Sequence, residues 1–136
     1  MATTFAFHSH AVYPTTSSLY LSGYAQYDVN RFYSMLLRLS NETMDTVYSK
    51  IYGELIPDKQ VLFQTITMHE SKLFVLGRAF DYETKFHLSL HKMDTLGNLI
   101  YSHDYAPTSN QSDADVGNPL QIVPASDGGF AITFEE

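Results

Sequence analysis

Histidines are the residues of this chain that could most readily bind an ion. His8 and His10 stand two residues apart on an expected strand, so both imidazoles would leave the same face. Such a pair could bind a metal or an anion, but the sequence offers no identifiable third ligand. His87 and His91 also share a face, yet four strand residues separate them by roughly 13 Å, too far to share one ion. All four are interpreted as ordinary polar strand residues, and no cofactor is expected.

A second candidate for metal binding is the segment 113–118, Asp-Ala-Asp-Val-Gly-Asn. A calcium ion needs several oxygens that converge from a tight loop, and Asp113 and Asp115 could supply some of them. The glycine, however, falls at the fifth position instead of the sixth, and the twelfth position holds no glutamate. A solvated acidic loop is therefore favoured over a calcium site.

Aromatic and acidic residues also stand together in two segments that occupy equivalent places in an internal repeat. The first segment is Tyr27-Asp28, and the second is Asp81-Tyr82-Glu83. Loops at the same end of repeated sheets form one surface, where rings beside carboxylates could bind a sugar or a peptide. The alternative is that both segments are plain polar turns.

Catalytic motifs are missing from the sequence. It has no Gly-x-Ser-x-Gly elbow, no His-Glu-x-x-His pair and no phosphate-binding glycine loop with a lysine. It has no cysteine, which excludes disulfides, thiolate metal sites and cysteine nucleophiles. We therefore expect no catalytic residue. The alternative is a glycan-active enzyme in which Asp28, Asp81 and Asp115 converge in a cleft.

The bulk properties exclude further classes of protein. The 136 residues suit one domain, and a net charge of −7 argues against a nucleic-acid partner. No apolar run approaches the roughly 20 residues of a membrane helix, so no membrane span is expected. No signal peptide is visible at the N-terminus.

The elements that would position these residues are β-strands. In Lys85–Met93, apolar Phe86, Leu88 and Leu90 alternate with polar residues, which is the period of a strand. The turn 94–98, Asp-Thr-Leu-Gly-Asn, follows it and suits a short hairpin.

This pattern recurs along the chain. Leu19 corresponds to Leu73, 54 residues later, and Val47 corresponds to Ile100, 53 residues later, with one residue lost in a turn. Repeats of this length with about four short strands each predict an all-β, β-propeller-like array of four-stranded antiparallel blades. We expect blade one at residues 3–53, blade two at 60–106 and half a blade at 119–136. The ten expected strands are Thr3–Tyr13, Leu19–Ala25, Phe32–Leu39, Val47–Tyr52, Gln60–Met68, Lys72–Ala79, Lys85–Met93, Leu99–Tyr105, Leu120–Ala125 and Gly129–Glu135.

The two blades differ in one respect. In blade one, Tyr33, Met35 and Leu37 make the second face of the third strand apolar, whereas the second face in blade two is polar. A sheet that is apolar on both faces needs neighbours on both sides. The array is then truncated, or it assembles with another chain, or the N-terminal residues cover the face. Tyr20, Tyr48, Tyr52, Tyr101 and Tyr105 are expected to pack in the core and between blades.

Three short segments resemble the blades of secreted bacterial β-propellers. The pattern is a Ser-Asp-Gly-Gly-Phe hairpin, a Lys-Leu-Asp-x-x-Gly-Asn strand and turn, and a Trp-Ser-Lys-x-Tyr-Gly strand. Segments 126–130, 92–98 and 48–53 match these in turn, although Tyr48 and Tyr101 stand where tryptophan is common.

The resemblance implies an extracellular or cell-surface setting and no particular reaction. We expect a non-catalytic segment used for protein or glycan binding or as a scaffold. The expected partners are further blades of a larger propeller, another copy of the chain, or a protein or glycan ligand. A fragment of a carbohydrate-active enzyme and a self-assembling structural unit are the alternatives.

Overall fold

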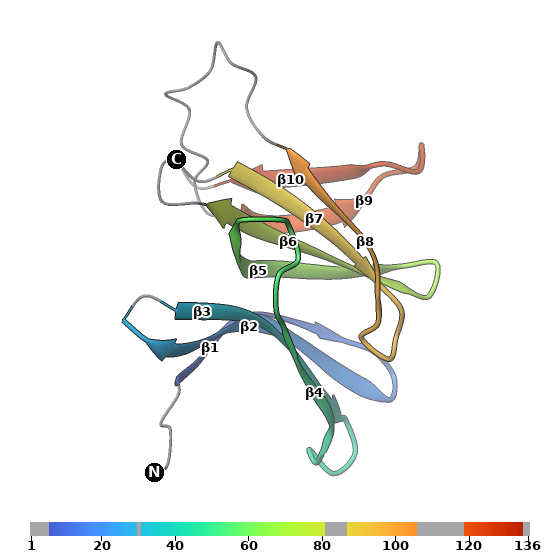
Figure 1. The fold of residues 1–136 in the computed structure, drawn as a ribbon. Coiled ribbons are helices and arrows are strands. Elements are labelled where there is room, and N and C mark those ends of the chain that lie inside the picture. Colours follow the sequence, from blue (N-terminus) through green and yellow to red (C-terminus); the bar gives the residue numbers. More distant parts are fainter. Residues whose placement is uncertain (1–5, 30, 81–86, 106–118, 135–136) are drawn as a thin grey trace, which may run out of the picture.

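Ten antiparallel β-strands form three sheets in the computed structural model, which describes residues 6–29, 31–80, 87–105 and 119–134. None of these residues is helical, which confirms the all-β prediction. Sheet 1 has the order β1-β2-β3-β4, sheet 2 the order β5-β6-β7-β8, and sheet 3 contains β9 and β10 (Figure 1). The strands are β1 Ala6–Pro14, β2 Ser18–Asp28, β3 Arg31–Ser40, β4 Thr46–Tyr52, β5 Gln60–His69, β6 Lys72–Phe80, β7 His87–Met93, β8 Leu99–Tyr105, β9 Pro119–Pro124 and β10 Phe130–Phe134.

The expected strands all form, with shifted ends. The largest shift shortens the connection between β2 and β3. A loop was expected over residues 26–31, but Gln26 pairs with Phe32 and Asp28 pairs with Arg31. The segment resembled a loop because it is polar. A strand end that faces solvent does not need apolar residues, so the same composition suits a tight hairpin end.

The internal repeat extends to the irregularities of the backbone. A β-bulge interrupts the β1–β2 pairing between Ser9 and Ala11, and an equivalent bulge interrupts β5–β6 between Phe63 and Thr65. Bulges also fall at equivalent places in the β3–β4 and β7–β8 pairings. A bulge is a specific backbone feature, so its recurrence shows that the two sheets are built on one pattern.

A glycine stands opposite the first bulge in each sheet. A Cβ at Gly23 would lie 2.0 Å from the backbone oxygen of His8. A Cβ at Gly77 would lie 2.9 Å from the side chain of Val61 and 3.0 Å from the backbone oxygen of Leu62. The bulged strand therefore approaches so closely that only glycine fits without a shift.

Strand β5 lies at the centre of the molecule. It contacts β1, β2 and β3 of sheet 1 and also β9 of sheet 3. Sheet 1 and sheet 3 lie on opposite sides of sheet 2 (Figure 1). The alternation along β6 shows the same arrangement, because Leu73 and Val75 enter the core toward sheet 1 while Phe74 and Leu76 enter the core toward sheet 3.

The core between sheets 1 and 2 is the larger of the two. Its buried members are Tyr20, Leu36, Ile56, Val61, Phe63, Ile66, Leu73, Val75, Ala79 and Met93. The core between sheets 2 and 3 contains the buried residues Phe74, Leu76, Leu90 and Ile122. The unequal size follows from strand number, since sheet 3 places two described strands over a four-stranded sheet.

The second face of β7 differs from its expected environment. His87, Ser89 and His91 were interpreted as ordinary polar strand residues, yet they are 2%, 0% and 0% exposed. They face sheet 1; Ser89 and His91 have hydrogen-bond partners within sheet 2, whereas His87 Nδ1 lies beside Asp104 without a hydrogen bond. Among the described residues, no helix could cross a membrane.

Candidate functional site

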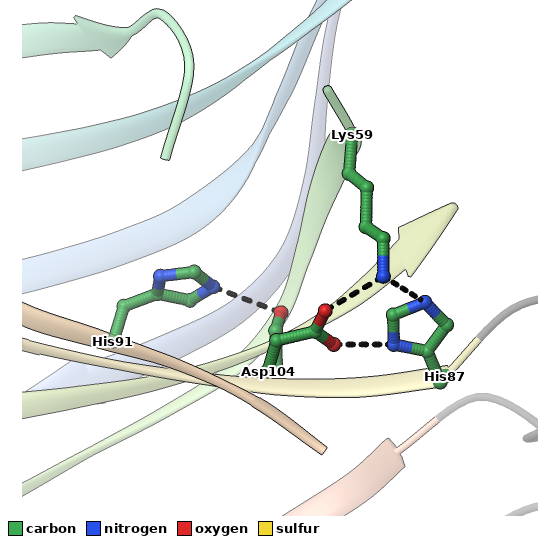
Figure 2. A network of polar contacts seen from close by, with 5 residues as sticks. Lys59, His87, His91 and Asp104 are labelled. Atoms are coloured by element: carbon green, nitrogen blue, oxygen red, sulfur yellow. Dashed lines mark hydrogen bonds and ion pairs between the residues drawn. The ribbon is translucent and has the colours of Figure 1, made fainter. Parts of the chain in front are cut away.

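The interface between sheets 1 and 2 holds a buried group of polar residues. Lys59 precedes β5, His87 begins β7, and Asp104 lies near the end of β8, and the three side chains converge (Figure 2). Lys59 Nζ donates a hydrogen bond to Asp104 Oδ2 at 2.7 Å and lies 3.0 Å from His87 Nε2. The Lys59 and Asp104 side chains are 19% and 21% exposed, so water screens this ion pair only in part.

Lys59 determines which ring nitrogen of His87 carries the proton. An ammonium group only donates, so His87 Nε2 accepts and the ring proton lies on Nδ1. His87 Nδ1 lies 2.5 Å from Asp104 Oδ1, without the alignment of a hydrogen bond. The carboxylate thus balances the lysine charge and faces the protonated ring nitrogen.

His91 forms a second polar group, four residues after His87 on the same strand. Its Nδ1 lies 2.7 Å from Ser102 Oγ, and its Nε2 lies 2.9 Å from Ser89 Oγ. Burial lowers the pKa of His91 to about 3, and the nearby charge of Asp104 raises it by less. His91 is therefore neutral at neutral pH, and both ring nitrogens have a hydroxyl partner.

The chemistry open to this polar group is restricted by burial. A serine beside a histidine can act as a nucleophile and its base, but Ser89 and His91 are both fully buried. A substrate could not reach them without separation of the two sheets. The described residues also contain no cluster of three or more metal-ligating side chains. The arrangement fits a structural role in which Lys59 is tied to β7 and β8 within sheet 2.

A direct contact between the two sheets is made by β4, whose side chains bind the β7–β8 turn. Tyr48 Oη donates to the carbonyl of Thr95 at 2.9 Å, and Tyr52 Oη donates to the carbonyl of Gly97 at 2.6 Å. Lys50 Nζ donates to Asn98 Oδ1 at 2.7 Å. We call Tyr48, Lys50 and Tyr52 the β4 clamp. Burial raises the pKa of both clamp tyrosines, so their hydroxyls stay protonated as donors.

The turn held by the β4 clamp is also stabilised by hydrogen bonds of its own. Asp94 Oδ1 accepts hydrogen bonds from the backbone N–H groups of Leu96 and Asn98, each at 2.9 Å. Asp94 Oδ2 accepts from Asn98 Nδ2 at 3.0 Å. The bonds from Asn98 lower the pKa of Asp94. Gly97 has a φ of 79°, a left-handed conformation that glycine adopts without strain.

Two hollows accompany the interfaces. A cleft of about 230 Å³ lies between the sheets beside Lys59, with Phe32, Glu54 and Phe80 among its lining residues. A wider groove of about 670 Å³ is lined by residues of β1, β5, β9 and β10, including Tyr13 and Thr67. The first strand of each sheet, β1, β5 and β9, therefore borders one shared space.

The predicted metal candidates have different outcomes. His8 and His10 are exposed on β1 and both stack on Tyr24, with ring centroids 4.9 and 5.1 Å away. Burial and the neighbouring His8 lower the pKa of His10. Asp113 and Asp115 lie outside the described residues.

The predicted ligand surface is described only at one corner. Tyr27 packs edge-on against Tyr33 at 5.1 Å, and Asp28 ends β2. Asp81, Tyr82 and Glu83 lie outside the described residues. The alternative of a glycan-active enzyme, in which Asp28, Asp81 and Asp115 would converge, therefore stays untested.

Sequence reasoning missed both the Lys59–His87–Asp104 group and the contact of β4 with the β7–β8 turn. Lys59 was placed in a linker and Asp104 was not singled out, because each is one charged residue in a polar context. A signal was available in the polar face of His87, Ser89 and His91, since a polar face of a strand that has a packed sheet on each side must be buried. The tyrosines were expected to pack between blades, and Tyr48 and Tyr52 do so, but Tyr101 and Tyr105 are 43% and 47% exposed.

Comparisons with known proteins complete the description of the site. No model of a protein family, no curated protein and no solved structure matches this chain. The resemblance to the blades of secreted bacterial β-propellers therefore stays a prediction.

Proposed function

We propose that the chain is a segment of a β-propeller-type array that acts as a non-catalytic scaffold for binding, as part of a secreted or cell-surface protein. One observation carries the proposal. The β4 clamp of sheet 1 holds the turn of the next sheet, and the equivalent residues of sheet 2, Tyr101, His103 and Tyr105, are exposed. A contact that joins one repeat to the next, and whose counterpart on the following repeat is exposed, is typical of an array.

The stacking of the sheets supports the same proposal. The inner strands follow one another in space, because β5 contacts β1 on one side and β9 on the other. In a propeller the innermost strands of successive blades surround an axial channel. The 670 Å³ groove bordered by β1, β5 and β9 is consistent with part of such a channel.

Burial of the potential catalytic groups supports the non-catalytic part of the proposal. An enzyme must present its nucleophile or acid to a substrate, whereas Ser89, His87 and His91 are at most 2% exposed. The carboxylate of Asp104 is held by Lys59 at 2.7 Å. These groups are best explained as internal structure of a scaffold.

The array part is tested by removing clamp hydroxyls in matched pairs. Tyr48→Phe and Tyr52→Phe should each lower the free energy of unfolding by about 1 kcal/mol, because each removes one hydrogen bond to a carbonyl. Tyr101→Phe and Tyr105→Phe should leave it unchanged in the isolated chain. Urea denaturation measures all four, and equal losses in both pairs would contradict the proposal.

The non-catalytic part is tested by incubating the chain with a panel of oligosaccharides. We expect no new reducing ends above a buffer control. Release of reducing sugar that disappears in the Asp28→Asn or the Asp81→Asn variant would instead favour the carbohydrate-active alternative.

A further inference from the structure

The exposed face of β8 in sheet 2 has a counterpart in sheet 1, where the equivalent strand β4 binds a turn. Sheets 1 and 2 each have four strands, whereas the described part of sheet 3 has two. Within the described residues β10 pairs only with β9, so its other edge has unpaired backbone groups. The third and fourth strands of a complete sheet would lie beside that edge, over β7 and β8.

The side chains on this part of sheet 2 are suited to hold a turn. Tyr101, His103 and Tyr105 alternate along β8 and leave the same face. His103 packs against Tyr105 with ring centroids 4.3 Å apart, and Lys92 Nζ lies 5.8 Å from the centroid of the Tyr101 ring. The surface thus offers two phenol donors beside a lysine and an imidazole, a combination that favours a turn with carbonyl and acidic groups.

The β4 clamp shows what such a surface binds. Tyr48, Lys50 and Tyr52 precede Tyr101, His103 and Tyr105 by 53 residues, and they hold the turn 94–98 by two carbonyls and the side chain of Asn98. On sheet 1 the two tyrosines are partly buried, and their hydroxyls bond to this turn. On sheet 2 the equivalent rings are 43% and 47% exposed.

Glycine is required at one position of the bound turn. A Cβ at Gly97 would lie 3.0 Å from Tyr52 Oη, 3.1 Å from Lys50 Cδ and 3.2 Å from Tyr48 Cε2. A larger side chain would therefore push the tyrosines away from the carbonyls. The turn must also support the left-handed φ of 79° found at this glycine.

The turns of a second copy of this chain do not meet these requirements. Its turn 94–98 is already held by its own β4 clamp. The equivalent turn of sheet 1, residues 40–45, has Met44 at the position of Gly97, with a φ of 62° and a side chain that is 56% exposed. Methionine there would clash with the rings that grip the glycine.

We propose that Tyr101, His103 and Tyr105, together with the free edge of β10, bind a β-hairpin from outside these 136 residues whose turn has the sequence Asp-x-x-Gly-Asn. The hairpin adds two antiparallel strands to sheet 3, and its turn carbonyls accept hydrogen bonds from the two tyrosines. This inference rests on the proposed array and names the element that continues it.

The test uses the 136-residue chain and a peptide with the sequence of residues 80–105, which contains the required turn. Titration of the peptide, followed by NMR, should shift the resonances of Tyr101, His103, Tyr105 and β10. The double variant Tyr101→Phe, Tyr105→Phe should bind at least about tenfold more weakly, because two hydrogen bonds are lost. A peptide carrying Gly97→Val is the matched control and should not bind.

A free hairpin folds poorly on its own, so a tethered version provides a second measurement. Phe130 corresponds to Leu73, which aligns the end of the chain with Ala79, and the sequence of residues 80–105 can therefore follow Glu136 directly. The extended chain should have a higher melting temperature than the same chain with valine at the appended turn glycine. Tyr101 and Tyr105 should also become protected from nitration.

Two results would overturn the inference. If neither the free nor the tethered hairpin protects the tyrosines, no such hairpin binds there, even if the clamp variants of sheet 1 behave as the array requires. If sedimentation shows that the unmodified chain associates through Tyr101 and Tyr105, the partner is a second copy. Loss of the sheet 1 clamp effect would instead contradict the array itself.

Discussion

The β3–β4 hairpin of sheet 1 and the β7–β8 hairpin of sheet 2 follow the same backbone path but have opposite surroundings. Tyr33, Met35 and Leu37 on β3 are apolar, and of these only Met35 is buried, whereas Tyr33 and Leu37 are partly exposed. The equivalent residues of β7, His87, Ser89 and His91, are polar and buried against sheet 1.

This contrast teaches that the repeat determines backbone geometry, while the neighbours of each sheet determine its side chains. Both sheets keep the bulges and the glycine opposite the first bulge. The β4 clamp of sheet 1 holds a turn of sheet 2, whereas the equivalent residues of β8 are exposed. Substitutions at equivalent positions of the two sheets therefore measure how much each neighbouring sheet contributes to the free energy of unfolding.

The largest expected difference between equivalent positions concerns Leu36 and Leu90. Leu36 is fully buried in the core between two four-stranded sheets, and Leu90 belongs to the smaller core under β9. We expect Leu36→Ala to lower the free energy of unfolding by about 3–5 kcal/mol and Leu90→Ala by about 2 kcal/mol. Chemical denaturation measures both, and a greater loss for Leu90→Ala would show that the main core has been misplaced.

The next effect concerns His91, whose counterpart in sheet 1 is Leu37. The pKa of His91 is lowered to about 3 in the folded chain, whereas an unfolded histidine titrates near 6.5. Its stabilising effect is complete above pH 6.5 and is lost as the pH falls toward 3, because the unfolded chain takes up the proton first. Between these values the loss is about 1.4 kcal/mol per pH unit.

The variant His91→Leu removes this dependence. Its stability should fall less steeply than that of the unmodified chain between pH 6 and pH 4, while the carboxylates and His87 contribute similarly in both. Urea titrations at several pH values give the two slopes. Identical slopes would mean that His91 is not buried as a neutral base.

A smaller pair of effects compares the two turns at Gly97 and Met44. Gly97→Ala should destabilise the chain by about 1–2 kcal/mol, because the added Cβ is strained at positive φ and presses on the β4 clamp. Met44→Gly should stabilise it by less than about 1 kcal/mol, because the exposed methionine has only the backbone strain to lose. Thermal unfolding of both variants measures the pair, and a gain of stability in Gly97→Ala would contradict the described turn.

The repeating pattern of the sequence predicted the strands well. Alternation in segments such as Leu99–Tyr105 and the offset between Leu19 and Leu73 depend on local periodicity, which the chain shows directly. The equivalence of those two leucines is confirmed, since Leu19 pairs with Leu39 and Leu73 pairs with Met93, again 54 residues apart.

The contacts between sheets could not be predicted in the same way. The grip of Tyr52 on Gly97 joins residues of the two sheets that are 45 positions apart. Such contacts depend on how two sheets are rotated and spaced, which no local pattern records. The exposure of Tyr101 was missed for a related reason, because a repeated tyrosine was expected to have a repeated partner.

The contact of the β4 clamp with the next turn is the central claim, and NMR tests it most directly. A Cβ added to Gly97 would lie 3.2 Å from Tyr48 Cε2, so the α-protons of Gly97 lie close to the Tyr48 ring. We predict nuclear Overhauser effects between the Gly97 α-protons and the ring protons of Tyr48 and Tyr52. A well-folded chain in which these effects are absent would contradict the stacking of the two repeats.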